Sequence, residues 1–296
     1  MALVVALGCL MVSAPPASAT FPGRNGLIVF DTQDRPGIDG GSSQIYTVKP
    51  DGSNLRQLTH LGAGHNAFDP HWSPDGHWVA YVSDIAGGPA VWVMRADGTG
   101  NHQLVSDPGY DHFSPSWSPD GQRLVFSRCS QFLRTCALAV VRSDGAGLRV
   151  LVGGNWNFGQ PVWSPDGRWL AYTSDKGGFD SRLWVARADG DAPHTIAPAR
   201  LVPDRPAWSP DSTQITFTGD PVNGQLFSIH RDGTGQRALT SGATIFGTWS
   251  PDFRRMVLIS FRTGAATLVV ATADARAQST IVTPPGVARS DWAVAR

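Results

Sequence analysis

The sequence contains no glutamate, because all 24 of its acidic residues are aspartate. Lysine occurs only at Lys49 and Lys176, whereas glycine occurs 33 times and proline 22 times. Glutamate and lysine favour helices, and glycine and proline disfavour helix interiors. The composition therefore argues against a helical protein. It also excludes mechanisms that need a glutamate as acid, base or metal ligand.

The sequence has no charge surplus and no common catalytic motif. Lysine plus arginine equals 24, which balances the aspartates, whereas nucleic-acid binders normally carry a basic excess. No nucleic-acid partner is therefore expected. The motifs GxSxG, HExxH and CxxC are all missing. The apolar share of 41% is sufficient for a core, and 296 residues suit one large all-β domain or two ordinary domains.

Long hydrophobic runs are also missing. The one apolar run, residues 2–14, is too short to span a membrane and precedes the small-x-small segment Ala17-Ser18-Ala19. We expect residues 1–19 to be an export signal and the mature chain, 20–296, to be secreted, periplasmic or otherwise in the cell envelope. A lipid anchor on Cys9 and a buried N-terminal strand are the alternatives. No transmembrane segment is expected.

The two remaining cysteines, Cys129 and Cys136, flank a polar segment between two apolar runs. Disulfides persist in exported proteins, and this spacing suits a bond across a long hairpin loop. A metal site would need further ligands, and the segment between the two cysteines supplies no histidine or aspartate. We therefore predict a disulfide between them, with two unrelated thiols as the alternative.

What is present is an internal repeat. Trp-Ser-Pro-Asp recurs five times at separations of 45, 46, 45 and 41 residues, and a sixth tryptophan follows 43 residues later. An Asp-Gly pair lies 24–27 residues after the tryptophan, preceded by a short apolar run. The repeated tryptophans are Trp72, Trp117, Trp163, Trp208, Trp249 and Trp292.

Each unit predicts four short strands. The innermost strand ends at the tryptophan, and Ser-Pro-Asp-Gly suits a type I turn. A second strand such as 78–83, a variable loop, a third strand such as 91–94, an Asp-Gly turn and a fourth strand follow. Four antiparallel strands in about 40–45 residues is the period of a propeller blade.

The two ends of the repeat predict ring closure. The first unit lacks its tryptophan, which would fall near Phe21, and Trp292 has no strands after it. We expect residues 287–296 to supply the inner strand for the blade of residues 21–59. The fold class predicted is an all-β, six-bladed β-propeller of four-stranded antiparallel blades.

The Trp-Ser-Pro-Asp-Gly repeat, with its apolar strand and Asp-Gly turn, resembles the TolB-like β-propeller repeat. The resemblance covers essentially residues 21–296. It implies a six-bladed propeller used mainly for protein–protein contact in the cell envelope. The translocation proteins of that family carry an α/β domain before the propeller, which we do not expect here, so a role in their system does not follow. Related propellers cap serine peptidases, and we expect no hydrolase domain after this propeller.

Repeated positions have structural explanations, so candidate binding residues are sought elsewhere. The turn aspartates are expected to be turn residues, and the repeated tryptophans to be core. The uniform turns should form one face, and the long loops the other, where binding sites usually lie. On the loop face we select six candidate binding residues: His65, Asp69, Asp111, His112, Trp156 and Arg205.

The sequence therefore predicts an exported, non-catalytic propeller that binds an envelope or extracellular protein, or else a glycan, as a monomer without cofactors. The alternative is a metal-dependent enzyme, such as a polysaccharide lyase or hydrolase, with its site at the channel mouth. Histidines near residues 60–71 and 112 and the adjacent aspartates suggest that alternative. A polar loop surface explains the same residues more simply.

Overall fold

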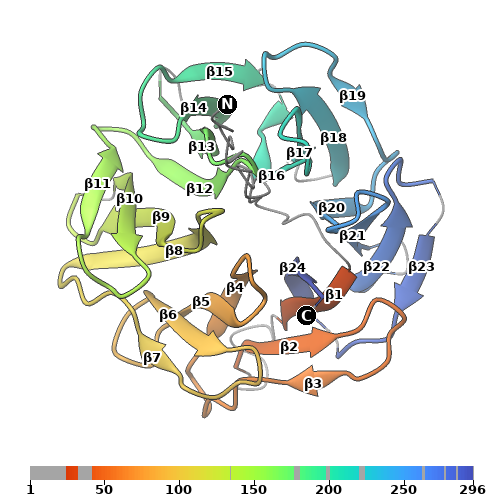
Figure 1. The fold of residues 1–296 in the computed structure, drawn as a ribbon, viewed down its shortest axis with the longest axis horizontal. Helices are drawn as coiled ribbons and strands as arrows, with labels where there is room; N and C mark the ends of the chain where they lie inside the picture. Colours follow the sequence, from red (N-terminus) through yellow and green to blue (C-terminus); the bar gives the residue numbers. More distant parts are fainter. Residues whose placement is uncertain are drawn as a thin grey trace, which may run out of the picture.

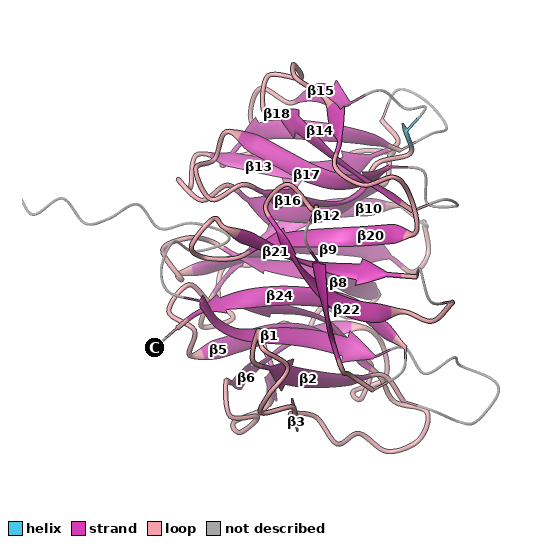
Figure 2. Ribbon diagram, turned by 90° about the vertical axis from the view of Figure 1, so that its right-hand side faces the viewer, coloured by secondary structure: helices cyan, strands magenta, loops and turns pink. Residues whose placement is uncertain are grey.

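The computed structural model describes residues 25–32, 42–133, 135–176, 181–197, 201–219, 224–261, 264–276, 278–284 and 286–295. These residues form six four-stranded antiparallel sheets, arranged as the blades of a propeller around a central axis (Figure 1). The predicted fold class is confirmed. Seen from the edge, the strands cross the thickness of a disc and the turns and loops lie at its two faces (Figure 2).

Every blade has one inner strand beside the axis and three further strands outward. Blade 1 consists of β24 (Val287–Val294), β1 (Asn25–Thr32), β2 (Gln44–Val48) and β3 (Arg56–Gln57). Blade 2 consists of β4 (Ala67–Trp72), β5 (Trp78–Ser83), β6 (Ala90–Arg95) and β7 (His102–Gln103). Blade 3 consists of β8 (Tyr110–Trp117), β9 (Arg123–Ser130), β10 (Cys136–Arg142) and β11 (Arg149–Val152).

The remaining three blades repeat this order. Blade 4 consists of β12 (Phe158–Trp163), β13 (Trp169–Ser174), β14 (Arg182–Arg187) and β15 (His194–Ala197). Blade 5 consists of β16 (Asp204–Trp208), β17 (Gln214–Gly219), β18 (Gln225–His230) and β19 (Arg237–Ala238). Blade 6 consists of β20 (Thr244–Trp249), β21 (Arg255–Ser260), β22 (Thr267–Thr272) and β23 (Gln278–Ile281).

Blade 1 is shared between the two ends of the described chain. β24 pairs antiparallel with β1, and the register places Ile28 opposite Trp292 and Phe30 opposite Ser290. The indole nitrogen of Trp292 donates a hydrogen bond of 3.2 Å to the carbonyl of Gly26. The predicted closure of the ring by the C-terminal strand is therefore confirmed.

The Ser-Pro-Asp turns are held by the side chains that repeat in them. In blade 4, the Ser164 hydroxyl donates to the Asp166 carboxylate at 2.6 Å and accepts a bond from the Trp169 amide at 2.9 Å. Asp166 also accepts a bond from the Arg168 amide. The same serine–aspartate bond recurs in blades 2, 3, 5 and 6. The repeated aspartates are turn residues, as the sequence predicted.

The repeated tryptophans form the core between blades. Trp72, Trp163, Trp208 and Trp292 are each at most 2% exposed. Each of the six apolar clusters contains buried residues from two neighbouring blades, so every blade packs on both of its neighbours. Trp156, which has no counterpart in the repeat, is 39% exposed.

The predicted disulfide is present. Cys129 and Cys136 lie directly opposite each other on β9 and β10, at the end of the hairpin next to its connecting loop. The bond closes the loop that leads from the second to the third strand of blade 3.

We expect the purified native protein to contain no free thiol at these two positions. Intact mass spectrometry after alkylation under non-reducing conditions measures this directly, and two alkyl groups on Cys129 and Cys136 would refute the bond. Reduction should lower the free energy of unfolding by on the order of 2–3 kcal/mol, because the closed loop is short. Urea unfolding with and without reductant measures that loss.

The predicted export signal, residues 1–19 with Cys9, lies outside the described residues and stays a prediction. Within the described segments, no helix is long and apolar enough to cross a membrane.

Candidate functional site

Four inner strands share a backbone irregularity three residues before their tryptophan. Asp69, Ser114, Gln160 and Arg205 all have positive φ, between 51° and 55°. The strand register shifts at each of these positions, which is the signature of a β-bulge. Residues other than glycine seldom adopt such φ values, and bulges re-aim side chains at barrel rims. Here they bring the four side chains to the wall of one cavity at the axis.

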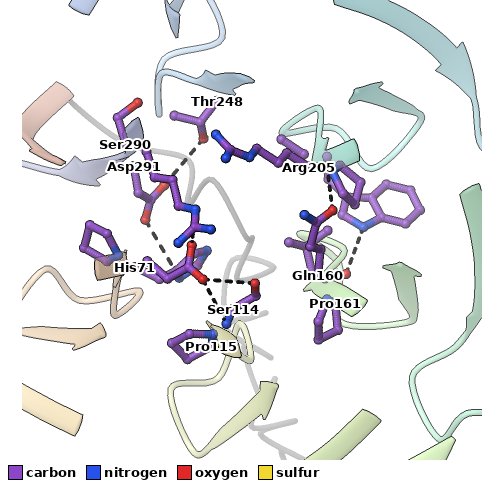
Figure 3. A pocket seen from close by; sticks show the side chains of 16 residues that line it. His71, Ser114, Pro115, Gln160, Pro161, Arg205, Thr248, Ser290 and Asp291 are labelled. Atoms are coloured by element: carbon purple, nitrogen blue, oxygen red, sulfur yellow. Dashed lines mark hydrogen bonds and ion pairs between the residues drawn. The ribbon is translucent and has the colours of Figure 1, made fainter. Parts of the chain in front are cut away.

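Arg289 occupies the corresponding position on β24 and lines the same cavity. We call Asp69, Ser114, Gln160, Arg205 and Arg289 the mouth ring. Four of the five residues are followed by a proline that also lines the cavity. The cavity wall is shown in Figure 3. Proline has a fixed φ and no backbone N–H to donate a hydrogen bond. About 90 Å³ of the cavity is open to the centres of water-sized molecules, which is enough for several waters or one small polar group.

One half of the mouth ring is an ion pair that links blades 1, 2 and 3. The Arg289 Nε atom lies 2.7 Å from Oδ1 of Asp69. The other oxygen of Asp69 accepts bonds of 3.2 Å from both the amide and the hydroxyl of Ser114. Burial works against the charge of Arg289, but Asp69 and then Asp31 outweigh it and raise its pKa.

The other half links blades 4, 5 and 1. The Gln160 side-chain oxygen accepts a bond of 2.7 Å from the Arg205 amide, and its nitrogen donates to Asp204. Arg205 extends across the cavity and donates from Nη1 to the Ala288 carbonyl at 2.8 Å. Burial, and next the neighbouring Arg289, lower the pKa of Arg205. Its guanidinium therefore spans the cavity between blades 5 and 1.

A further carboxylate, Asp291, connects blades 6, 1 and 2 at the same cavity (Figure 3). It accepts a bond of 2.8 Å from the Trp72 amide, and Nδ1 of His71 lies 3.8 Å from the same oxygen. The Thr248 hydroxyl lies 3.5 Å from the other oxygen. The cavity wall therefore joins all six blades through polar side chains.

Asp31 lies on β1 directly opposite Arg289 and is fully buried. Neither of its carboxylate oxygens accepts a hydrogen bond of normal geometry. Burial raises its pKa to about 7, which Arg289 and Arg205 oppose and the negative charge of Asp69 reinforces. The side chain of Asp31 is therefore mostly neutral below about pH 7 and carries a buried negative charge above it.

We expect Asp31 to make the folded protein less stable as pH rises. Its folded-state pKa of about 7 exceeds the unfolded value, so its stabilising contribution is complete below about pH 4 and is lost as pH rises through about 7. The loss is on the order of 4 kcal/mol. Asp31→Asn, which resembles the neutral form, should therefore unfold at higher urea than the wild type at pH 8 and with a flatter pH dependence.

Urea unfolding at pH 5 and pH 8 measures this effect, with Asp191→Asn as the control because Asp191 is an exposed turn residue. Equal pH dependence in the wild type and Asp31→Asn would contradict it.

The candidate binding residues chosen from the sequence divide into three groups. Asp69 and Arg205 lie together in the mouth ring. His65, Asp111 and Trp156 lie on the surrounding loops and at the first residues of β8. There, His65 is 3.6 Å from Asp84 and Asp111 accepts a bond from Gln131.

His112 is the exception, because the structure does not place it on the loop surface. Its side chain is 1% exposed, 3.3 Å from Asp107 and edge-on to the ring of Phe126. Burial lowers the pKa of His112, and the hydrogen bond to Asp107 only partly opposes this. His112 was selected as a candidate binding residue on the loop face, but β8 already begins at Tyr110, so the strand alternation turns its side chain inward.

Sequence reasoning left Arg289, Gln160, Asp291 and Asp31 out of the candidate set. The first two were detectable, since they stand three residues before a repeated tryptophan, as Asp69 and Arg205 do. Asp31 carried a weaker signal, a lone aspartate at the end of an apolar strand. Among the described residues, no three histidine, cysteine or aspartate side chains form a group placed to hold a metal ion.

The model of the TolB β-propeller domain matches residues 22–210 and 98–295, which together span nearly the whole chain. The chain belongs to the TolB β-propeller domain family. This confirms the resemblance inferred from the repeat. One relative is an uncharacterized protein of Agrobacterium fabrum, which is 30% identical over 46% of this chain and 48% of its own length. Another is a protein named TolB homolog of Chlorobium chlorochromatii, which is 31% identical over 45% of this chain and 29% of its own length. The propeller thus spans half or less of these relatives.

Solved structures agree with the fold. TolB from Acinetobacter baumannii superposes with a TM-score of 0.76 at 18% identity, covering 90% of this chain and 66% of that one. An oligogalacturonate lyase in complex with manganese gives a TM-score of 0.62 at 18% identity, covering 89% of this chain and 76% of the lyase chain. At such identities the likeness concerns the propeller fold alone.

Proposed function

We propose that this TolB-type propeller is an exported, non-catalytic binding module that recognises another protein of the cell envelope or extracellular space. Recognition uses the loop face, which we define as the end of the disc that carries the loops between second and third strands and between blades. The opposite end, with the Ser-Pro-Asp and Asp-Gly turns, is the turn face. One observation carries the proposal: most of the large exposed apolar side chains among the described residues lie in loop-face segments.

The distribution of large exposed apolar side chains separates the two faces. Among the described residues, ten such side chains are exposed, and seven of them lie in loop-face segments. These seven are Ile85, Phe132, Leu133, Trp156, Val202, Phe261 and Val282. An excess of exposed apolar side chains on one face of a protein marks that face as a candidate interaction surface.

The mouth ring supplies the polar part of the same surface. Its side chains are held by the bulges and by hydrogen bonds between blades, so their positions exist before a partner arrives. A preorganised surface loses less entropy on binding. A glycan is the other ligand that such a face would suit, and identification of the bound species distinguishes the two.

The test begins with a pull-down by the mature protein from the envelope fraction of its source, followed by purification of the captured protein. We expect Trp156→Ala and Arg205→Ala to raise the Kd for that protein by about tenfold or more, since tryptophan and arginine often dominate interface energies. Trp156 is exposed, whereas Arg205 is largely buried in the wall of the mouth-ring cavity. Gln122→Ala and Arg168→Ala, at exposed turn-face positions, should change it less than twofold. Titration calorimetry gives each Kd, and the melting temperature verifies folding.

The opposite pattern would reject the proposal. If the turn-face variants weaken binding while Trp156→Ala leaves the Kd unchanged, the partner docks on the turn face. Capture of a polysaccharide without protein would reject protein recognition.

A further inference from the structure

The loop between β9 and β10 carries two adjacent and strongly exposed apolar side chains. Phe132 is 85% exposed and Leu133 is 76% exposed. Of the described large apolar side chains, only Val282 is comparably exposed, at 84%, and it stands alone in its loop. Single exposed apolar residues are ordinary, but an adjacent pair at a loop apex is a concentrated apolar surface.

A disulfide and local hydrogen bonds hold this apex. The disulfide Cys129–Cys136 closes its base. The Ser130 hydroxyl accepts bonds from the amides of Phe132 and Leu133, at 3.3 and 3.1 Å. Binding therefore would not have to order the backbone that presents the two side chains, which lowers the entropic cost of association.

The loop is also tied to the neighbouring connection before β8. The Gln131 amide donates to the Gly109 carbonyl at 3.1 Å, and the Gln131 side chain donates to the Asp111 carboxylate at 2.8 Å. Position 109 lies against the Phe132 ring, since a Cβ there would be 3.4 Å from it. The apex thus has a defined direction and a carboxylate at its base.

We propose that residues 130–133 form a knob that inserts Phe132 and Leu133 into an apolar pocket of the partner protein, with a basic side chain at the pocket rim facing Asp111. The knob proposal rests on the proposed function, because it assumes a protein partner and names the side chains that insert into it. The carboxylate at the base of the knob favours such a rim.

The alternatives to a protein partner match these observations less well. Stable binding to an anionic membrane combines apolar insertion with an excess of basic residues, whereas the 24 lysines and arginines of this chain are balanced by 24 aspartates. Arg134 follows Leu133 in the sequence, and Asp111 beside the knob offsets its charge. A second copy would have to offer a pocket for the knob. The cavity at the mouth ring is narrow and is lined by Asp69, Arg205 and Arg289.

The test places the photo-cross-linking residue p-benzoylphenylalanine at position 132 of the full chain, with position 150 as the control. Val150 is 49% exposed on the outer strand β11, away from the loop face. Illumination of cells of the source organism should yield one protein adduct at 132 and none at 150. The purified protein partner should then bind Phe132→Ser/Leu133→Ser with a Kd at least tenfold higher than wild type, and Val150→Ser within twofold.

Each other result is decisive. An adduct with a second copy of the chain, an adduct with lipid, or binding to vesicles of phosphatidylethanolamine and phosphatidylglycerol that Phe132→Ser/Leu133→Ser abolishes would overturn the knob proposal. Two further variants carry the cross-linking residue at position 156 on the loop face and at position 122 on the turn face. Adducts at position 156 but not 132 would leave the proposed function standing and remove the knob. Adducts only at position 122 would remove both. The disulfide variant Cys129→Ser/Cys136→Ser should weaken binding while both apolar side chains remain.

Discussion

A chain that lacks residues 287–296 is expected not to form a folded monomer. The deletion removes β24, so β1 loses its inner partner and its backbone donors and acceptors become an open edge. It also removes Trp292 from the cluster between blades 1 and 6. Exposed strand edges pair with other chains, so aggregation should accompany the loss.

Size-exclusion chromatography and thermal unfolding measure this, with a chain that lacks only residues 295–296 as the control. The point variant Trp292→Ala tests the same contact more mildly. It should lower the free energy of unfolding by about 3–5 kcal/mol, the usual cost of removing a buried aromatic side chain, whereas the exposed Trp156→Ala should have little effect. A monomeric truncated protein with an unchanged melting temperature would show that β24 does not close the ring.

Replacement of Arg289 by methionine should lower the free energy of unfolding by about 3 kcal/mol, because it leaves a buried carboxylate without its partner. Arg289 lies 2.7 Å from Asp69, and the side chains of the pair are 23% and 10% exposed. Methionine fills a similar volume, so the loss reports mainly the charge. The buried Asp31 also loses its nearest opposing charge, which should move its titration upward.

The double variant Asp69→Asn/Arg289→Met supplies the matched test. Asparagine retains an acceptor for the Ser114 bonds but carries no charge, so the double variant should recover much of the stability lost in Arg289→Met. Arg168→Met, on the exposed turn face, should change stability by less than about 0.5 kcal/mol. Urea unfolding at pH 7.5 of these three variants, the single variant Asp69→Asn and the wild type gives the free energies. Additive effects of Asp69→Asn and Arg289→Met would contradict a direct Asp69–Arg289 coupling.

The blade architecture was predictable because its signals repeat. Each Trp-Ser-Pro-Asp turn uses the same hydrogen bonds in five blades, so one local rule applied at a fixed spacing locates the strands. Ring closure followed from the unmatched ends of the repeat. The fourth strands were the weakest prediction: β3, β7 and β19 contain only two residues each, because outer strands have one partner and pack little.

The candidate site was only partly predictable, because it depends on features that do not repeat in type. The bulge position recurs, but its residue changes from aspartate to serine, glutamine and arginine. The spacing therefore locates the mouth ring but does not predict which of its side chains form ion pairs and hydrogen bonds with one another. His112 was misplaced by the start of one strand. The burial of Asp31 depends on β24, which is more than 250 residues distant in sequence. The exposure of Phe132 depends on the direction of a disulfide-closed loop.

Amide hydrogen exchange of the complex with the captured protein shows which face of the propeller binds. Binding at the loop face should slow exchange in residues 105–112, 130–133 and 153–160, together with the starts of the inner strands at the mouth ring. Residues 73–77, 118–122 and 164–168 on the turn face should exchange at the same rate as in the free protein. Slower exchange confined to those turns would place the partner on the turn face and refute binding through the loop face.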